Sequence, residues 1–206
     1  MKEGLEGIER ELRRSFGEIK EPILLYEGTV TCPVCGAKAL NLREYLYEIP
    51  FFGRILISAG KCAKCGYTYR DVRLAEITKP KKIVVRVKGE RELRYLLVKS
   101  AYAYLAIPEK GYEMIPGPAS TGFISTVEGV LHRFLEALNV ACKGREDKGC
   151  EENRKWLEDA IDGKKSFTLI ICDYEGASKV IGENVEELDL DDYCISKKPE
   201  WLATRL

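Results

Sequence analysis

The sequence contains no glutamine and only two methionines among 206 residues. Both side chains are thermolabile and are scarce in proteins from thermophiles, in which abundant charged residues form ion-pair networks. Charged residues make up 32% of this chain, so the composition favours a thermophilic, archaeal-like source. This matters for the eight cysteines, because disulfides can persist inside the cells of hyperthermophiles.

Two further absences limit the class of protein. The formal net charge is zero, with 33 basic and 33 acidic residues, which disfavours a protein that acts mainly on nucleic acid or on anionic membranes. No apolar run approaches the roughly 20 residues that span a bilayer, and the charged N-terminus lacks the apolar centre of a signal peptide. We therefore expect a globular, cytoplasmic protein without a membrane partner.

Catalytic motifs are also missing. The sequence has no glycine-rich phosphate loop after a strand, no G-x-S-x-G and no H-E-x-x-H. The single histidine, His132, falls in the middle of a predicted helix, where a surface position is more common than a role as catalytic base. One histidine is also too few for an iron oxygenase of the β-barrel type. We predict that the protein is not an enzyme.

Two cysteine pairs of the same shape stand in the first third of the chain. Cys32 and Cys35 enclose two residues, as do Cys62 and Cys65, and a glycine follows each pair. Such a pair bends the backbone into a knuckle whose N–H groups point at the sulfurs, and the glycine relieves a position of positive φ. Two knuckles together supply four sulfurs around a zinc ion. We predict one structural Zn²⁺ site.

Other roles fit the two pairs less well. A redox C-x-x-C motif usually occurs once, at a helix start in a βαβ unit, and two disulfides would each close a very short, strained loop. An iron site with four thiolates has the same ligands and stays open as an alternative. Because a catalytic zinc keeps one position for water, four thiolates indicate a metal that stabilises the fold and does no chemistry.

The remaining four cysteines carry weaker signals. Cys142 and Cys150 flank a loop between two predicted helices, and they either pair as a disulfide or stay free. Cys172 is expected to be a small core residue in a strand. Cys194 lies in the C-terminal tail, and its position in the sequence gives no indication of a role.

Hydrophobic periodicity divides the chain into three segments. Residues 1–21 are predicted to form an amphipathic helix, because apolar residues recur at spacings of three and four. Runs rich in aromatic and β-branched residues predict short strands around the knuckles, in a zinc-ribbon module of residues 22–78. A linker near residues 78–82 leads into a second domain, residues 79–206. The apolar stripe of the first segment comprises Leu5, Ile8, Leu12, Phe16 and Ile19.

The second domain is predicted to be β-structure interrupted by a helical hairpin at about residues 126–162. Ser125 and Glu128 fit the S-x-x-E capping box at the start of the first helix. After the helices, strand signal returns around a turn at residues 173–176, which predicts a β-hairpin.

Several segments of the second domain resemble the ZPR-one (ZPR1) family of zinc-finger proteins. The stretch GFISTVEGVL, downstream of the two knuckles, is similar to the family's threonine-rich helix start. VKSAYAYLAIPEKGYEMIPG resembles its V-K-S…I-P-E-L segment. SFTLIICDYEGAS resembles its F-T-L…D-P-x-G-x-S hairpin, with Tyr174 in place of proline.

The resemblance extends to the knuckles and covers residues 25–182. Phe51 and Phe52, which follow Ile49 and Pro50, are similar to the family's proline–aromatic segment between the cysteine pairs. Eukaryotic members repeat the unit of ribbon and domain, whereas this chain has it once, as archaeal relatives do. The family's C-terminal tyrosine–arginine–threonine stretch is replaced by DDYCISKKPEWL.

The resemblance implies a mainly β fold with an α insertion, in which a four-cysteine zinc ribbon precedes a double-stranded β-helix (jelly-roll-like) domain with an inserted helical hairpin. Eukaryotic relatives bind translation elongation factor 1-alpha and assist its folding. The resemblance therefore implies an adaptor or folding factor for a translation GTPase. The expected partner-contact residues are Phe51, Phe52, Gly122, Ser125, Thr126 and Glu128.

A nucleic-acid-binding zinc ribbon is the alternative function. Residues 79–99 are locally basic, and Tyr95, Tyr102 and Tyr104 lie in or near this stretch, as in proteins that stack bases on aromatic rings. The net charge of zero and the alternation of the tyrosines with apolar residues favour core positions for these rings instead.

Overall fold

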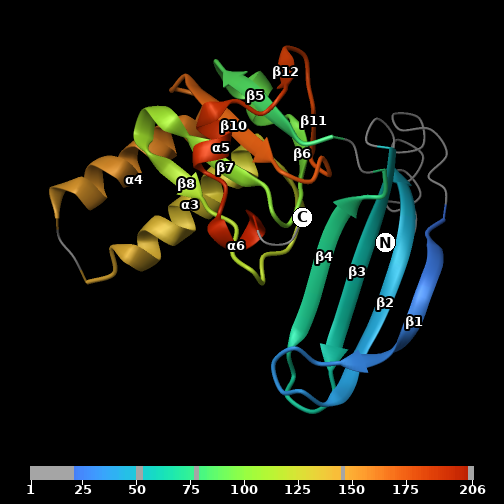
Figure 1. Ribbon diagram of the computed structural model, residues 1–206. Helices are drawn as coiled ribbons and strands as arrows, with labels where there is room; N and C mark the ends of the chain where they lie inside the picture. Colours follow the sequence, from blue (N-terminus) through green and yellow to red (C-terminus); the bar gives the residue numbers. More distant parts are fainter. Residues whose placement is uncertain (1–20, 50–52, 77–78, 145–146, 204–206) are drawn as a thin grey trace, which may run out of the picture. The chain divides into compact units, whose positions relative to one another are not determined.

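The chain forms two compact units, Met1–Glu76 and Ile77–Leu206, in a computed structural model (Figure 1). The structure describes residues 21–49, 53–76, 79–144 and 147–203. The predicted N-terminal helix and the predicted contact residues Phe51 and Phe52 therefore lie outside the described residues, apart from Glu21.

The first unit is a four-stranded antiparallel sheet in which each strand pairs with the next along the chain. The two knuckles are the connections from the first strand to the second and from the third to the fourth, so both lie at the same end of the sheet (Figure 1). Aromatic and β-branched runs led us to expect strands here. The strands are β1 (Ile23–Thr31), β2 (Lys38–Ile49), β3 (Gly53–Cys62) and β4 (Thr68–Leu74).

The second unit contains two antiparallel sheets, and this arrangement is the predicted jelly roll. The larger sheet has the strand order β12-β5-β10-β7-β8, and the smaller has the order β11-β6-β9. Neighbouring strands are joined in antiparallel register throughout. The strands are β5 (Lys81–Val87), β6 (Leu96–Lys99), β7 (Tyr104–Ile107), β8 (Tyr112–Met114), β9 (Phe123–Thr126), β10 (Phe167–Asp173), β11 (Lys179–Ile181) and β12 (Val185–Leu188).

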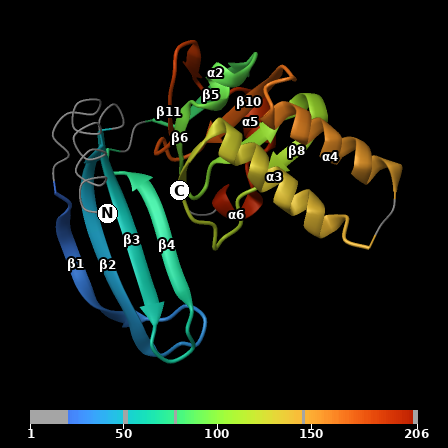
Figure 2. The same ribbon diagram turned by 180° about the vertical axis from the view of Figure 1, so that it is seen from behind.

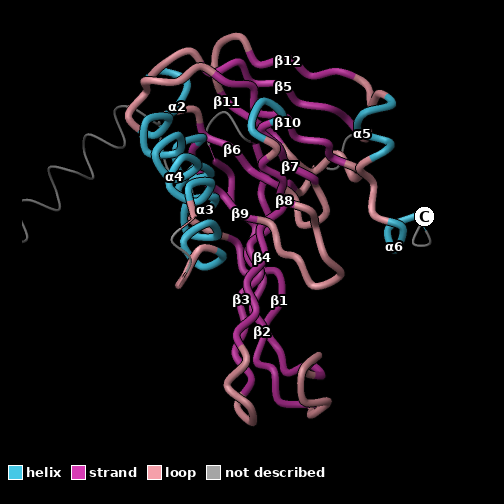
Figure 3. The backbone as a smooth tube through the Cα atoms, turned by 90° about the vertical axis from the view of Figure 1, so that its left-hand side faces the viewer, coloured by secondary structure: helices cyan, strands magenta, loops and turns pink. Residues whose placement is uncertain are grey.

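Two longer helices, α3 (Val127–Ala141) and α4 (Lys148–Ile161), form the helical hairpin predicted from apolar periodicity. Figure 2 shows them running out together to the loop that joins them. With α2 they lie on one side of the sheets, while α5 and α6 lie on the other (Figure 3). None of the helices in the described ranges has the length and apolar character needed to cross a membrane. The short helices are α2 (Glu90–Leu93), α5 (Asp192–Ser196) and α6 (Glu200–Ala203).

Strand β10 lies between two apolar clusters. Leu169 and Ile171 point into the main core, which is shared by both sheets and by α3 and α4. Ile170 and Cys172 point the other way, into a cluster that includes Leu202 from the C-terminal tail. Successive side chains of a strand face opposite sides, and here both sides are buried. This is why the strand has a continuous apolar sequence instead of an alternating one.

Helix α3 is capped by Thr126 and not by Ser125. The side-chain oxygen of Thr126 accepts a hydrogen bond from the backbone N–H of Gly129 at 3.0 Å. The predicted Ser125–Glu128 capping box is wrong by one residue, because β9 continues through Thr126. The Oε1 atom of Glu128 instead lies 3.7 Å from Nε2 of His132. His132 is a surface residue, with 52% of its side chain exposed.

The β-hairpin predicted around residues 173–176 is wrong. Strand β10 pairs with β5 and β7, whereas β11 pairs with β6 in the other sheet. The turn therefore carries the chain from one sheet to the other. A turn signal in the sequence marks a change of direction, but strand pairing depends on partners far away in the chain.

The linker predicted near residues 78–82 extends two residues too far, because Lys81 and Lys82 belong to β5. Their side chains are only 11% and 13% exposed, and they pair with Glu187 and Asp191 at 2.9 and 2.6 Å. Lysine is rarely buried unless it is paired. Glu187 and Asp191, which come much later in the chain, form these ion pairs and offset the cost of burying the two lysine charges.

Two disulfides join the cysteines outside the knuckles. Cys142 pairs with Cys150 across the loop between α3 and α4, which settles the alternative that the sequence left open. Cys172 in β10 pairs with Cys194 in α5, a bond that the sequence did not predict. Both of these residues are fully buried. The second bond ties the C-terminal helices to the larger sheet.

We expect the Cys172–Cys194 bond to contribute more stability than Cys142–Cys150. The bonds span 22 and 8 residues, for which the loss of chain entropy in the unfolded state corresponds to about 3.4 and about 2.5 kcal/mol. Replacing Cys172 and Cys194 with alanine should therefore lower the midpoint of thermal unfolding more than the same change at Cys142 and Cys150. Calorimetry of the two variants under oxidising conditions measures this, and an equal midpoint for wild type with and without reductant would contradict it.

Candidate metal centre

The four cysteines of the knuckles bring their sulfur atoms together at one end of the first sheet. Cys32 Sγ lies 3.7 Å from Cys65 Sγ, and Cys35 Sγ lies 3.7 Å from Cys62 Sγ. All four sulfurs lie within 4.8 Å of one another. Sulfurs placed tetrahedrally about 2.3 Å from a zinc ion are about 3.8 Å apart. The spacing in this structure therefore fits one zinc ion at the centre.

The two knuckles share one backbone geometry. The N–H group of Gly36 donates to the carbonyl of Cys32, and that of Gly66 donates to the carbonyl of Cys62, both at 3.0 Å. Both glycines have positive φ, 69° and 76°. Side chains with a Cβ rarely adopt this conformation, so the glycine after each pair has the role that the sequence analysis gave it.

The pKa values of Cys62 and Cys65 are shifted in opposite directions. The backbone N–H of Cys65 lowers the pKa of Cys62 to about 6. The N–H of Tyr67 acts to lower the pKa of Cys65, but burial and the neighbouring cysteine sulfurs outweigh it and raise that pKa to about 12. A second thiolate is thus unfavourable beside the first. A divalent cation would remove this repulsion, which is a further reason why the site suits a metal.

The hydrophobic cluster beside the metal centre is very small. The cluster around the sulfurs contains Leu40 as its one buried aliphatic residue, with a few partly buried neighbours. A cluster of this size is too small to stabilise a separate module without a metal or a disulfide. The partly buried neighbours are Val30, Cys35, Ala39, Tyr67 and Tyr69.

We expect purified protein to hold one zinc ion per chain and Cys35→Ser to lose it. Loss of the metal should unfold the first unit and leave the second folded, because the second unit has its own core. Acidification should release zinc, since protons compete with the metal for the cysteine thiolates. Elemental analysis and circular dichroism measure these changes, with Cys142→Ser/Cys150→Ser as a control that keeps its zinc. Protein that folds fully without bound metal would contradict the expectation.

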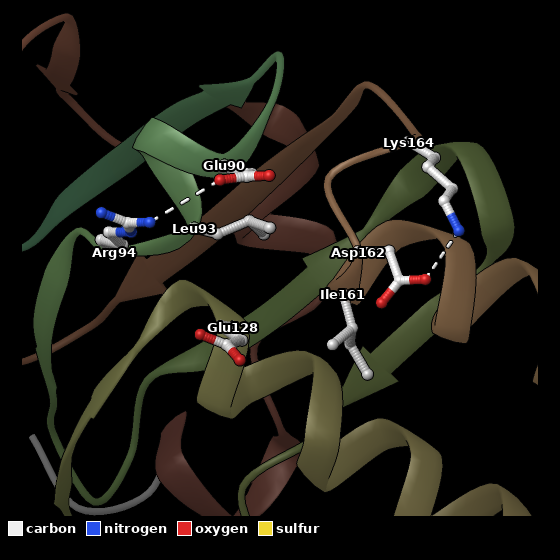
Figure 4. A pocket seen from close by; sticks show the side chains of 7 residues that line it. All are labelled: Glu90, Leu93, Arg94, Glu128, Ile161, Asp162 and Lys164. Atoms are coloured by element: carbon white, nitrogen blue, oxygen red, sulfur yellow. Dashed lines mark hydrogen bonds and ion pairs between the residues drawn. The ribbon is translucent and has the colours of Figure 1, made fainter.

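The other predicted contact residues lie in the second unit and differ in burial and in the element that carries them. Gly122 is buried, and Ser125 and Thr126 are the last two residues of β9. Glu128 lines a hollow with a volume of about 420 Å³ (Figure 4). Contact between these residues and a partner stays a prediction.

The hollow beside Glu128 lacks a catalytic arrangement among the described residues. Glu90 pairs with Arg94 at 3.6 Å, and Asp162 pairs with Lys164 at 2.8 Å (Figure 4). These carboxylates are neutralised by their own neighbours, and no cysteine, serine or histidine lines the hollow. Its rim is suited to a polar contact.

Segments that carry the family resemblance meet in a buried polar network. Ser100 Oγ donates to Asp173 Oδ1 at 2.9 Å, and the N–H group of Ser100 donates to Ser178 Oγ at 2.9 Å. The N–H group of Ser178 in turn donates to Asp173 Oδ2. All three residues are at most 1% exposed. The network joins the end of β6 to the end of β10, so these motif residues connect the two sheets.

Lys99, next to this network, is a buried cation with few partners. It is 2% exposed, its ammonium donates to the carbonyl of Ser100 at 2.9 Å, and it lies 5.7 Å from the centre of the Phe123 ring. In the described part of the chain no carboxylate forms an ion pair with it. Burial lowers the pKa of Lys99 to about 8, against the opposing effect of Asp173.

We expect Lys99→Met to stabilise the second unit by about 2 to 3 kcal/mol at pH 7, because it removes the cost of a buried charge. In wild type the unfolded chain binds more protons than the folded chain between pH 8 and 10.5, so stability should rise with pH in that range. Urea unfolding at pH 7 and pH 10 measures both effects. The variant should lose the rise, and Lys88→Met, at an exposed position, should keep it. The same rise in the Lys99→Met variant would contradict the assignment.

Comparison with known proteins matches both units. Residues 26–80 match the ZPR1 zinc-finger domain, and residues 91–198 match the ZPR1 jelly-roll domain. An uncharacterized ZPR1-like protein of Methanocaldococcus jannaschii is 38% identical over 177 residues, which cover 84% of this chain and 89% of that protein. A second, from Pyrococcus horikoshii, is 35% identical over 167 residues, 77% of this chain and 75% of that protein.

A eukaryotic relative matches over a smaller share of its own length. The zinc finger chaperone zpr1 of Schizosaccharomyces pombe is 31% identical over 163 residues, which cover 74% of this chain and 35% of that protein.

The geometry and the comparisons agree on the metal centre. The zinc-finger match includes all four cysteines whose sulfurs converge, so the centre is a structural zinc site. Each of the two domains is matched once, in the order that the fold shows. This chain belongs to the ZPR1 family of zinc-finger proteins.

Proposed function

We propose that this protein is an adaptor or folding factor and that its client is a translation GTPase of the elongation factor 1-alpha type. The observation that carries the proposal is the closed centre of four cysteine sulfurs. Four protein ligands leave no coordination position for a substrate or a reactive water. The metal then shapes a binding module, and the protein's work is to bind another protein, not to catalyse a reaction.

Two further points support this proposal. The relative in Schizosaccharomyces pombe is named a zinc finger chaperone, which favours a role in the folding of other proteins. The choice of client comes from the family resemblance stated above.

An exposed apolar edge on the first unit is suited to such a role. Ile23 and Leu25 of β1 are 59% and 55% exposed, and β1 is the edge strand of its sheet. Apolar residues on an open edge invite association with other chains, and natural sheets usually avoid them. An incompletely folded client presents the apolar segments that such an edge binds.

The basic stretch of residues 79–99 gives little support to the nucleic-acid alternative. Four of its cations pair with carboxylates in residues 186–191, so their charge is compensated within the protein and is not available for phosphates. Tyr95 and Tyr104 are buried and cannot stack on bases. The pairs are Lys79–Asp189, Lys81–Glu187, Lys82–Asp191 and Arg86–Glu186.

We expect the full chain to bind an archaeal elongation factor of the 1-alpha type and to raise its yield of GTP-binding protein on refolding. Ile23→Ser should weaken binding about tenfold to a hundredfold, because burying an isoleucine contributes about 1.5 to 3 kcal/mol and about 1.4 kcal/mol is a factor of ten. Calorimetric titration and recovered GTP binding are the measurements. Phe51→Ala/Phe52→Ala tests the contact residues that lie outside the described ranges.

Ile195→Ser is the matched control for Ile23→Ser. Ile195 is also 59% exposed, but it lies on α5 in the second unit. An equal loss of binding in both variants would show that β1 is not the contact edge. If wild-type protein neither binds the factor nor improves its refolding, the proposed client is wrong.

A further inference from the structure

One face of the first unit's sheet carries a continuous apolar row. The strand register places Leu24 opposite Tyr45, Tyr45 opposite Ile57, and Ile57 opposite Val72. Residues directly opposite each other on paired strands point to the same face. These four side chains, here called the apolar row, therefore cross the whole sheet on one side.

The neighbouring rows on this face define the extent of the apolar surface. Towards the connection between β2 and β3, the next row is apolar as well and contains Tyr47, Ile55 and Leu74. Towards the knuckles, the next row is charged, with Glu27 paired to Arg43 at 2.6 Å. The face is thus apolar in its half remote from the zinc and polar in the half near it.

The apolar row is incompletely covered. Leu24 is 47% exposed, and Tyr45, Ile57 and Val72 are half-buried. No member of the row belongs to any of the apolar clusters found among the described residues. A sheet with an apolar face is normally stabilised by a second layer packed on it. We therefore expect another element, with an apolar stripe of its own, to pack on the row.

The chain contains such a stripe directly before β1. Residues 1–20, which lie outside the described residues, carry apolar side chains at helical spacing, and Leu12, Phe16 and Ile19 are the last three. Only Glu21, Pro22 and Ile23 separate Ile19 and Lys20 from Leu24 in the row. Since each residue spans at most about 3.6 Å, this short connection holds the end of the stripe close to the row.

We propose that the apolar stripe of residues 1–20 binds the apolar row of the same chain and covers this face of the zinc ribbon. Two turns of helix, from Leu12 to Ile19, measure about 11 Å, and four strands about 4.8 Å apart span about 14 Å. The last three apolar residues of the stripe are thus enough to cover the row. The row is then a binding surface that is occupied in the free chain by the chain's own segment. This inference does not depend on the proposed client.

Photocrosslinking in the full chain tests the contact directly. A benzophenone amino acid is placed at position 16, where it replaces another large apolar ring, and at position 10 as a control on the opposite side of the helical stripe. We expect position 16, and not position 10, to crosslink to peptides that contain Tyr45, Ile57 or Val72. A mixture of isotopically labelled and unlabelled protein distinguishes bonds within a chain from bonds between chains. Crosslinks between chains, crosslinks to other segments, or equal yields from both positions would overturn the proposal.

A pair of charge-matched variants tests the consequence for the surface. Phe16→Asp and Arg10→Ala each lower the net charge by one, but only the first disrupts the stripe. We expect Phe16→Asp to increase the binding of a fluorescent apolar dye several-fold while the zinc content per chain stays the same, and Arg10→Ala to behave like wild type. Dye binding that is unchanged in Phe16→Asp would overturn the proposal.

Discussion

The attraction between four cysteine thiolates and one divalent cation is the interaction on which the first unit depends. Among its described residues the apolar cluster at the knuckles is small, and outside that cluster only Ile55, Ser58 and Leu74 are buried. The metal therefore supplies stability that a core of this size cannot supply, and it fixes the ends of all four strands at once. Because the same four sulfurs fill the coordination sphere, the centre is closed to chemistry. Stability and the absence of metal catalysis follow from one arrangement.

The second unit is stabilised by different means. Its two sheets and two long helices share one extensive core, and a second cluster anchors the C-terminal helices. The disulfide between Cys172 and Cys194 and the carboxylates that follow β11 reinforce this anchor. Basic and acidic residues that look like separate charged runs in the sequence lie beside each other on β5 and β12. Opposite charges that are far apart in the sequence are therefore paired inside one sheet.

Motif residues that identify the family serve the fold in this structure. Ser100, Asp173 and Ser178 join the two sheets through buried hydrogen bonds, and Thr126 begins α3. A family signature made of such residues reports a shared architecture, and it says less about the surface that a partner contacts. The apolar edge of the zinc ribbon, which no motif marks, is a better candidate for a partner contact because the side chains of Ile23 and Leu25 are exposed.

The sequence by itself determined the features that depend on short spacing. The ligand pairs, the glycines after them, the presence of strands around the knuckles and the helical hairpin could be predicted, because each is set by residues within a few positions of one another. Only the tertiary structure decided which distant groups meet. The Cys172–Cys194 bond, the separation of β10 from β11 into different sheets, and the burial of Lys81 against Glu187 depend on contacts across 22 to 106 residues. Local periodicity carries no information about such partners, because the packing of the whole domain selects them.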